Sequence, residues 1–389
     1  MAVSLRLSIE RIQLTNFRSY PGLTLEAGPE PQVLTGPNGA GKTNLLEAIS
    51  LLVPGNGLRS AHMRDFARAG GDGSWSVAAH VHSRIGPVGI GTGLRQARGD
   101  ERISRIVRID GEPKSSPGVL ADYLEVVWLT PAMDGLFTGP GSDRRQFLDR
   151  LIVCFDPGYR TLANRFDKAM QNRNRLLAGG VTDNAQLEGF EITMAEAGIA
   201  VAAARRQALG ALARLIEDRR VRDADSAFPW AALALEGAID DDLATSPAVD
   251  VEDRYLRMLR HARERDREAG RTLDGPHRTD LVVGHGPKGM PARLSSSGEQ
   301  KSLLLGLVLA HAELVRQNRG GLAPILLLDE VTAHLDEWRR AALFTEIERL
   351  GAQAWMTGTD QSAFAALAGK AHFWRAEEGR IAPSDGAVS

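Results

Sequence analysis

The chain has 389 residues, of which 43% are hydrophobic and 25% charged, a composition typical of an ordinary globular protein. Its formal net charge of -2 predicts no bulk attraction to nucleic acid, so a DNA site would have to be a local patch. A single cysteine, Cys154, excludes an internal disulfide and a cysteine-based metal cluster. No apolar run approaches the roughly 20 residues of a membrane helix, and the N-terminus lacks the layout of a signal peptide. We therefore expect a cytoplasmic protein without a membrane partner.

The first third of the sequence predicts mixed β-structure around one helix. Apolar and polar residues alternate over residues 7–14, and a change of phase at Glu10 and Arg11 indicates an irregularity in this opening strand. Residues 102–109 also alternate and end at Asp110-Gly111, a common hairpin turn. Further expected elements are a strand at 32–35, a helix at 42–52 and a buried strand at 124–129.

The middle of the chain changes character. Residues 143–223 are rich in Ala, Leu and Arg with helical spacing, and a second, highly charged helical stretch covers residues 250–271. The segment between them contains two prolines and a run of aspartates, which favours a loop or an excursion at a sheet edge. Short apolar runs then alternate with helices, as in α/β domains, at residues 281–283, 325–328 and 354–357.

These patterns predict an α/β fold with an inserted second lobe that is mainly helical. The α/β domain is expected to be discontinuous, with residues 1–130 and 272–389 folding together. Residues 131–271 are expected to form the helical lobe.

A glycine-rich loop at residues 36–43 carries the strongest functional signal. It follows an expected strand and precedes an expected helix, which is the context that a phosphate-binding loop requires. Its backbone N–H groups converge on phosphates, and the N-terminus of the following helix favours the same negative charge. Lys42 is expected to reach the β- and γ-phosphates of ATP, and the Thr43 hydroxyl to ligate Mg²⁺. The residues expected to contact the nucleotide are Gly36, Pro37, Asn38, Gly39, Ala40, Gly41, Lys42, Thr43 and Asn44, together with Arg18.

A second signal is an apolar run that ends in two acids, Asp329 and Glu330. Four apolar residues fit a buried parallel strand, which delivers carboxylates to the edge of the sheet where α/β sites form. We expect Asp329 to hold Mg²⁺ and Glu330 to polarise the water that attacks the γ-phosphate. Such a run is most often a plain strand end, but combined with the glycine loop it predicts ATP hydrolysis.

A third signal is the segment Ser296-Ser-Gly298-Glu-Gln, which precedes a long apolar helix. By itself it is a plausible helix cap. The order of the glycine loop, this segment, the Asp329-Glu330 pair and residues 333–336 nevertheless resembles the ABC-type ATPases. The resemblance implies an ABC-type P-loop ATPase head in which Ser296 and Gly298 contact the ATP held by a second copy of the chain. Residues 333–336 would couple the two sites.

Three further elements narrow the resemblance to the RecF family of bacterial DNA-repair proteins. Residues 14–20 contain an Asn-Phe-Arg opening similar to that of the family. Residues 144–149 resemble its Arg-Arg-x-Phe-Leu-Asp element, and residues 275–278 its Gly-Pro-His-Arg element. The resemblance extends from residue 5 to about residue 360. One departure is Ala132, where the family usually has an acid after the proline.

The resemblance implies an ATP-dependent DNA-binding protein of recombinational repair. Such a protein dimerises on ATP, binds single-stranded, gapped or junction DNA, and helps to load the RecA recombinase together with the RecO and RecR proteins. It is also linked to replication restart and to the SOS response. The implied activity is a weak DNA-dependent ATPase that uses ATP and Mg²⁺ and acts as a conformational switch. Its catalytic residues would be Glu330, Lys42 and, from the second copy, Ser296.

Two other classes of ATPase share these motifs. The ATPase subunit of a membrane transporter would carry a glutamine near residues 127–130 and a switch histidine at the position of Thr359. This chain has neither, which leaves Thr359 as the candidate that senses the γ-phosphate. A chromosome-condensing ATPase would need long heptad arms between the first motif and the serine-glycine segment. The intervening chain is too short for such arms.

Charge is distributed unevenly along the middle of the chain. Residues 144–222 hold 14 basic and nine acidic residues, a net charge of +5, whereas residues 223–253 hold nine acidic and no basic residues. Arginines give DNA phosphates a salt-dependent and sequence-independent affinity, although on helices they more often face solvent or form salt bridges. A second candidate cluster comprises Arg59, Arg64 and Arg68.

Overall fold

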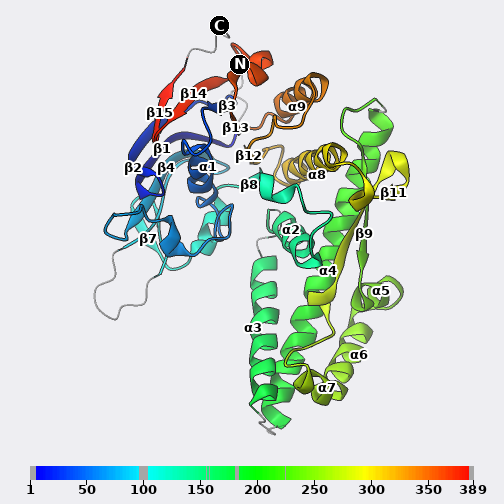
Figure 1. The fold of residues 1–389 in the computed structure, drawn as a ribbon. Helices are drawn as coiled ribbons and strands as arrows, with labels where there is room; N and C mark the ends of the chain where they lie inside the picture. Colours follow the sequence, from blue (N-terminus) through cyan, green and yellow to red (C-terminus); the bar gives the residue numbers. More distant parts are fainter. Residues whose placement is uncertain are drawn as a thin grey trace. The chain divides into compact units, whose positions relative to one another are not determined.

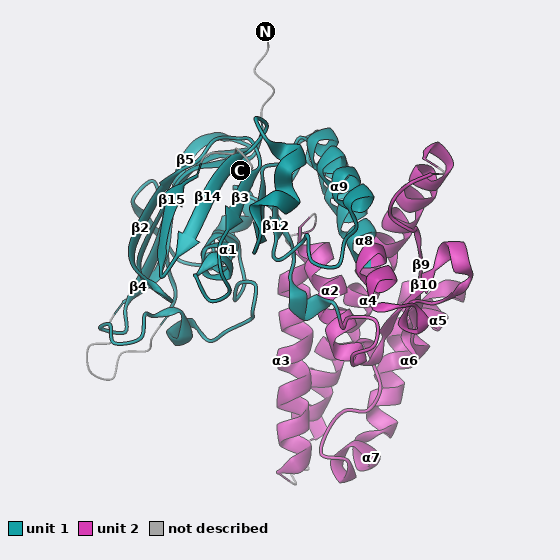
Figure 2. Cartoon of the chain, turned by 45° about the horizontal axis from the view of Figure 1, so that its top comes forward, with its two compact units in different colours: residues 1–134, 304–389 teal, residues 135–303 magenta. Residues whose placement is uncertain are grey.

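A computed structural model describes residues 6–95, 104–154, 156, 158–179, 184–223 and 225–384. The chain divides into two compact units (Figure 1 and Figure 2). Unit 1 comprises residues 1–134 and 304–389, and unit 2 comprises residues 135–303. The first and last parts of the chain therefore fold together, and the middle forms an insertion.

Unit 1 contains two six-stranded sheets. Its strands are β1 (Ser8–Phe17), β2 (Tyr20–Glu26), β3 (Gln32–Thr35), β4 (Trp75–Ser83), β5 (Gly86–Leu94), β6 (Ile106–Ile109), β7 (Glu112–Lys114), β8 (Val126–Leu129), β12 (Ile325–Leu328), β13 (Ala354–Gly358), β14 (His372–Glu377) and β15 (Arg380–Pro383). The first sheet has the order β2-β1-β4-β5-β6-β7 and is antiparallel. The second has the order β15-β14-β3-β13-β12-β8 and is parallel except for its edge strand β15.

Helical segments connect these strands. They are α1 (Lys42–Ser50), α9 (Glu337–Leu350) and the short 3₁₀ segments η1 (Met63–Phe66), η2 (Pro117–Asp122), η3 (Pro131–Met133) and η7 (Gln361–Leu367). A long helix, α8 (Ser297–Asn318), begins in unit 2 and continues into unit 1. It leads directly toward β12, whose four residues are all fully buried in the parallel sheet.

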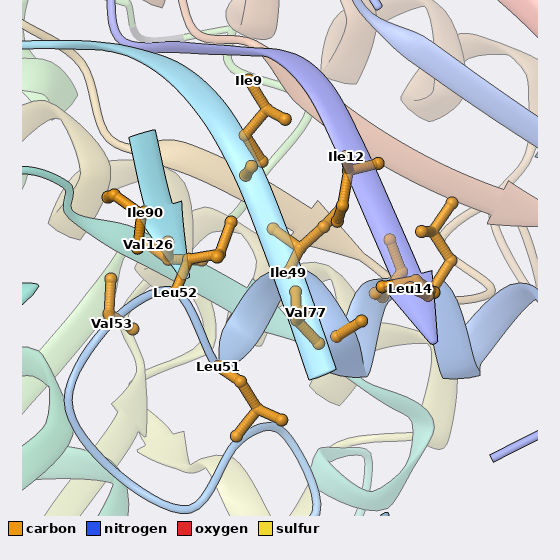
Figure 3. Close-up of a cluster of buried hydrophobic side chains, with 14 of the residues drawn as sticks. Ile9, Ile12, Leu14, Ile49, Leu51, Leu52, Val53, Val77, Ile90 and Val126 are labelled. Atoms are coloured by element: carbon orange, nitrogen blue, oxygen red, sulfur yellow. The ribbon is translucent and has the colours of Figure 1, made fainter. Parts of the chain in front are cut away.

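The core of unit 1 lies between the two sheets and includes α1 (Figure 3). Ile9 and Ile12 of β1 are both fully buried although they lie three positions apart. A register shift between Ile9 and Arg11 makes this possible, because the extra residue of a β-bulge reverses the alternation of faces. The phase change predicted at Glu10 and Arg11 is therefore confirmed. Ile49 of α1 packs in the same cluster as Val126 of β8, so one core holds both sheets and the helix.

Most expected elements of unit 1 are confirmed, with shifts at their ends. The strand at 32–35 has the predicted bounds, but α1 ends at Ser50 rather than at residue 52. The strand expected at 124–129 begins at Val126. β6 begins at Ile106, and the hairpin turn at Asp110-Gly111 joins it to β7. Residues 102 and 103 lie outside the described residues.

Unit 2 is mainly helical. Its helices are α2 (Gly141–Val153), α3 (Tyr159–Ala178), α4 (Asn184–Arg222), α5 (Ala238–Thr245), α6 (Ala248–His261) and α7 (Arg263–Glu268), with the 3₁₀ turns η4 (Pro276–Arg278), η5 (Gly286–Lys288) and η6 (Ala292–Leu294). Its strands β9 (Ala231–Glu236), β10 (Asp280–His285) and β11 (Met290–Pro291) form a small antiparallel sheet in the order β11-β10-β9. Phe166 of α3, Met194 of α4 and Tyr255 of α6 meet in its core.

The apolar run at residues 281–283 was expected to be a strand of the α/β domain, and this expectation is wrong. The run lies in β10, which pairs antiparallel with β9, and Leu281 lies opposite Leu235. Residues 272–303 accordingly belong to unit 2, whereas the sequence analysis places the return to the α/β domain at residue 272. A short apolar run predicts a strand, but its partner strand is decided by tertiary pairing.

The segments beside β9 also differ in detail from the sequence-based expectations. The region between residues 223 and 250 contains β9, which is an edge strand, so the expected excursion at a sheet edge is confirmed. The same region also contains the helix α5, which was not expected. The charged stretch at 250–271 consists of two helices, α6 and α7. In the part of the chain that the structure describes, no helix is both long and apolar enough to span a membrane.

Candidate nucleotide-binding site

The glycine loop joins β3 to α1, and its conformation requires glycine at both ends. Gly36 and Gly41 have φ angles of 145° and 108°, in the region that side chains disfavour. A Cβ atom on Gly36 would lie only 2.2 Å from the carbonyl oxygen of Ala376, so no side chain fits there. The Tyr20 hydroxyl donates to the carbonyl oxygen of Gly41 at 2.9 Å. Residues 37–39 between these fixed ends are exposed.

Lys42 lies inside the curve of this loop. Its Nζ donates to the carbonyl oxygens of Gly36 at 2.6 Å and Pro37 at 2.9 Å. Burial lowers the pKa of Lys42, while the carboxylates of Glu330 and Asp329 act in the opposite direction. The structure therefore brings the predicted lysine and the two predicted acids together.

The N-terminus of α1 faces the same loop. Its first hydrogen bonds run from the N–H groups of Asn44 and Leu45 to the carbonyl oxygen of Gly41. The N–H groups of Lys42 and Thr43 precede these bonds, so they have no partner within the helix. Such groups attract anions, and the helix dipole adds to the attraction.

Thr43 and Asp329 form the candidate metal site. Thr43 Oγ1 lies 3.0 Å from both Oδ1 and Oδ2 of Asp329, which directly follows β12. Adjacent ligands of an octahedral Mg²⁺, each at about 2.1 Å, are about 3.0 Å apart. These oxygens therefore fit a shared Mg²⁺. The described residues contain no group of three or more His, Cys, Asp or Glu that could hold a metal.

Thr357 orients both acids and was missed by the sequence analysis. It lies in β13, the parallel neighbour of β12, and its hydroxyl donates to Asp329 Oδ1 at 2.7 Å. Thr357 Oγ1 in turn accepts the N–H of Glu330 at 2.8 Å. The signal that could have found Thr357 is its position at the carboxyl end of the apolar run at 354–357, beside Asp329. Thr359, which the sequence suggests as the sensor of the γ-phosphate, is exposed, and this role stays a prediction.

Arg18 has well-defined protein partners next to α1. Its guanidinium makes a bidentate pair with the buried carboxylate of Glu47, at 2.7 and 3.0 Å, and also donates to the carbonyl oxygen of Asp65. It stacks over Phe66 with its Cζ 5.0 Å from the ring centre. Arg18 therefore lies beside the helix that carries Lys42, but the contact with ATP that the sequence analysis assigns to it stays a prediction.

Asn44 and the candidate cluster of Arg59, Arg64 and Arg68 lie in the same unit as Arg18. Asn44 accepts from Arg59 at 3.4 Å and donates to Ser19 at 2.9 Å. Arg59 also approaches the Glu47 carboxylate at 3.6 Å. Arg64 lies in η1, and the backbone N–H of Arg68 bonds to Asn16. Arg59 thus contacts two residues of α1, and it shares neither of these partners with Arg64 or Arg68.

The serine-glycine segment forms the N-terminus of α8 in unit 2. The N–H of Ser296 donates to the Glu299 carboxylate at 3.0 Å, and the N–H of Glu299 donates to Ser296 Oγ at 3.4 Å, a capping box. The Lys288 ammonium and this cap lower the pKa of Glu299 to about 2. Ser296 is exposed, and a Cβ on Gly298 would meet no atom within 4 Å. The helix cap expected from the sequence is confirmed, and the surface around it is open.

Residues 333–336 lead from Glu330 into α9. Asp336 caps this helix by accepting the N–H of Arg339 at 2.8 Å, and its carboxylate also pairs with the Arg339 side chain. His334 is exposed and has a φ angle of 66°. The segment therefore ends at the helix cap formed by Asp336, and the side chain of His334 faces solvent two residues earlier.

Comparison with known proteins decides the family. The family described as RecF/RecN/SMC N terminal domain matches residues 8–372. The chain is 50% identical over 379 residues to the DNA replication and repair protein RecF of Mesorhizobium japonicum, a match that covers 97% of this chain and 98% of the relative. The corresponding protein of Agrobacterium fabrum is 53% identical over 378 residues, with 97% and 98% covered. The chain belongs to the RecF family.

A solved structure supports the fold of this RecF-family chain. The recombination mediator protein RecF-ATPrS in the RecFOR pathway matches with a TM-score of 0.84 at 23% identity, covering 97% of this chain and 98% of that chain. The α/β ABC-type ATPase head with a mainly helical insertion is thus confirmed. These comparisons do not favour the transporter subunit.

Two of the RecF-like elements are partners inside unit 2. Arg144 makes a bidentate pair with Asp280 at 2.8 and 2.7 Å, and this lowers the pKa of Asp280. Arg145 donates to the carbonyl oxygen of Thr279 at 2.9 Å. Arg205 of α4 then joins Asp149 to the carbonyl oxygen of Pro276. Arg205 therefore joins the Arg-Arg-x-Phe-Leu-Asp element to the Gly-Pro-His-Arg element, and Arg144 and Arg145 bond to the two residues that follow the second element.

Proposed function

We propose that this RecF-family chain is an ATP-dependent DNA-binding protein of recombinational repair whose ATPase acts as a conformational switch. The observation that carries the proposal is the continuous chain of contacts from Thr43 through Asp329 and Thr357 to Glu330. These contacts gather a metal-binding hydroxyl, an acid that can ligate Mg²⁺ and an acid that can activate water beside one phosphate-binding loop. The 50% identity to a DNA replication and repair protein supports DNA as the partner.

Each residue of the site has a separate role in ATP hydrolysis. The loop N–H groups and α1 bind phosphate, and Lys42 exchanges its two carbonyl partners for β- and γ-phosphate oxygens. Thr43 and Asp329 would hold Mg²⁺, which when bound would neutralise charge that develops on the phosphates. Glu330 accepts the proton of the attacking water. Thr357 keeps both acids in place through its hydroxyl.

Dimerisation on ATP would complete the site. The exposed N-terminus of α8 offers Ser296 and Gly298 in a form suited to a phosphate, because a helix N-terminus and its capping hydroxyl attract anions. Two copies would then enclose two ATP molecules, each between the glycine loop of one copy and the α8 terminus of the other. Hydrolysis would be slow and stimulated by DNA, and it would reopen the pair.

In this role the chain would bind single-stranded, gapped or junction DNA, act with the RecO and RecR proteins and help to load RecA recombinase. A connection to replication restart and to the SOS response would follow from the same activity. The similarity of the fold to a recombination mediator protein of the RecFOR pathway supports this role.

DNA binding with and without ATP tests the proposal. Purified protein is titrated onto labelled gapped, single-stranded and duplex oligonucleotides by fluorescence anisotropy, each with no nucleotide, with ATP and with ADP. We expect ATP to tighten binding and the gapped substrate to be preferred. Equal affinity for all three substrates without any nucleotide effect would overturn the proposal. Lys42→Met is the control, because it should lose the response to ATP and keep any nucleotide-independent binding.

A further inference from the structure

The outer face of α3 carries a continuous row of polar and basic side chains. Residues recur every three or four positions along the row, so they lie on one face of the helix. Thr161, Asn164, Lys168, Gln171 and Arg175 are exposed, and Asn172 is half-buried. We call these six residues the α3 stripe.

The opposite face of α3 is committed to the interior of unit 2. Phe166 packs in the helical core, and Arg173 is fully buried in contact with Glu191 and Asp266. The helix therefore cannot rotate to bury the α3 stripe without removing these groups from their partners. The orientation of the stripe toward solvent is fixed by packing.

Basic side chains elsewhere on the surface of unit 2 are commonly paired with acids. Arg165 pairs with Glu196, and Arg260 pairs with Glu188. In contrast, the side chains of Lys168 and Arg175 form no ion pair or hydrogen bond with other described residues. Their charges are therefore available to an external anion.

Only one acid occurs in α3, Asp167, and it is exposed next to the α3 stripe. Asp167 lines a hollow of unit 2 together with Arg145, Asp149 and His277. Burial raises the pKa of Asp167, and the charge of Arg205 opposes this shift. Asp167 thus lies at the edge of the α3 stripe, and the stripe itself combines two cations with hydroxyl and amide groups and contains no acid.

We propose that the α3 stripe binds the sugar–phosphate backbone of duplex DNA. This inference rests on the proposed function, in which DNA is the partner. Lys, Arg, Asn, Gln and Thr are the side chains that proteins use for phosphate and sugar contacts. The row from Thr161 to Arg175 is about 21 Å long, given 1.5 Å per helical residue. It therefore spans about six base pairs of duplex at 3.4 Å each.

The chemistry of the α3 stripe favours duplex over single-stranded DNA. Surfaces that bind single strands add aromatic side chains on which the bases stack. None of the six residues is aromatic. A straight row of cations and amides contacts the outside of a duplex, where phosphates are regularly spaced and the bases are already stacked. The stripe is thus a contact for the double-stranded part of a gapped substrate.

The test compares two double variants by fluorescence anisotropy on a duplex and on a single strand of equal length, over a range of salt concentrations. Lys168→Ala with Arg175→Ala removes both cations of the α3 stripe. Arg257→Ala with Arg271→Ala removes two exposed cations from α6 and from the segment after α7, so the net charge changes equally. Circular dichroism and thermal midpoints check that both variants stay folded, which we expect because all four side chains are exposed.

We expect the stripe variant to bind duplex DNA at least about tenfold more weakly at ~0.1 M salt. Its log–log salt slope should fall by about 1.8, since each lost phosphate contact contributes about 0.9. Affinity for the single strand and all affinities of the control variant should change much less. An unchanged duplex affinity, or an equal loss in the control, would overturn the α3 stripe as a binding surface. An equal loss on the single strand would overturn its assignment to duplex. If the unaltered protein bound no DNA at all, the proposed function would fail as well.

Discussion

At the scale of single residues, Glu330 stands out for its backbone. It is a non-glycine residue with a φ angle of 47°, a conformation that costs roughly 1–3 kcal/mol and persists where the surroundings enforce it. Here the enforcing contact is the hydrogen bond from its N–H to Thr357 Oγ1. The turn takes the chain out of β12 immediately after Asp329. In the proposed mechanism, this turn allows consecutive residues to serve different roles, Asp329 as a metal ligand and Glu330 as a base.

The role of Glu330 can be tested with Glu330→Gln, which keeps the shape of the side chain and removes its ability to accept a proton. We expect ATP hydrolysis to fall by about 10²–10⁴-fold, the usual contribution of a general base. Nucleotide affinity should be nearly unchanged, and the ATP-bound dimer should persist longer. Single-turnover hydrolysis and equilibrium binding of labelled ATP measure the two effects. Glu112→Gln, on the exposed strand β7, is the control. Normal turnover in Glu330→Gln would rule out this glutamate as the base.

Thr357 should matter for turnover through its contacts with Asp329 and with the backbone of Glu330. Thr357→Val keeps the volume but deprives Asp329 of a donor and leaves the Glu330 N–H without its acceptor, a loss of about 1–3 kcal/mol. We expect hydrolysis to fall by at least about tenfold. Thr357→Ser restores the hydroxyl and should recover most of the rate. If valine and serine variants hydrolysed ATP equally well, the positioning role of Thr357 would be disproved.

At the scale of elements, unit 2 is fastened by a buried ionic network. Arg173 of α3 contacts Glu191 of α4 and Asp266 of α7, and all three side chains are almost completely buried. Arg173 also donates to Thr272 and to the carbonyl oxygen of Leu259. One arginine therefore joins α3 to three other helices, α4, α6 and α7, and to the segment after α7. Buried charges are tolerated only because each has partners.

Breaking this network should destabilise unit 2 strongly. Arg173→Met leaves Asp266 without its principal cation, and loss of one partner from a buried pair costs about 3–5 kcal/mol. Arg165→Met, on the same helix, removes an exposed pair with Glu196 and should cost less than about 1 kcal/mol. Urea unfolding followed by circular dichroism compares the two variants. Similar midpoints for both would show that the network contributes little to stability.

β10 shows what sequence patterns leave open at this scale. The short apolar run at residues 281–283 predicted a strand, and the strand exists. Its assignment to the α/β domain failed because strand propensity reports local backbone preference and burial, not the identity of the partner strand. The Arg144–Asp280 pair joins residues that are 136 positions apart and anchors the start of β10 to α2. This long-range contact could not be deduced from the neighbourhood of either residue.

At the scale of the whole molecule, each chain holds one copy of both halves of the proposed ATP site. The glycine loop and the two acids lie in unit 1, while Ser296 and Gly298 lie at the start of α8 in unit 2. The α8 terminus is exposed and leaves open space at Gly298. Such an arrangement suits closure by a second copy, in which identical surfaces exchange equivalent contacts about a two-fold axis.

ATP should therefore control the oligomeric state. We expect the unaltered protein to change from monomer to dimer on addition of ATP, as measured by multi-angle light scattering. Ser296→Arg places a bulky side chain on the α8 terminus and should abolish the dimer while ATP binding is retained. Lys42→Met should abolish both. A Lys42→Met variant that still dimerised on ATP would contradict the proposed enclosure of ATP between two copies of the chain.

The sequence by itself determined the phosphate-binding loop, the Asp329-Glu330 strand end, the capped α8 terminus and the general α/β character of the chain. These features are local, since glycine conformation, strand burial and helix capping act within a few residues. Only the tertiary structure revealed that Thr357 orients both acids, that Arg18 pairs with Glu47 and that β10 belongs to the inserted unit. Each of these depends on contacts between residues far apart in the sequence, and folding brings them together through sheet order and helix packing. The same packing buries part of the predicted basic segment in ion pairs and leaves the α3 stripe to face solvent.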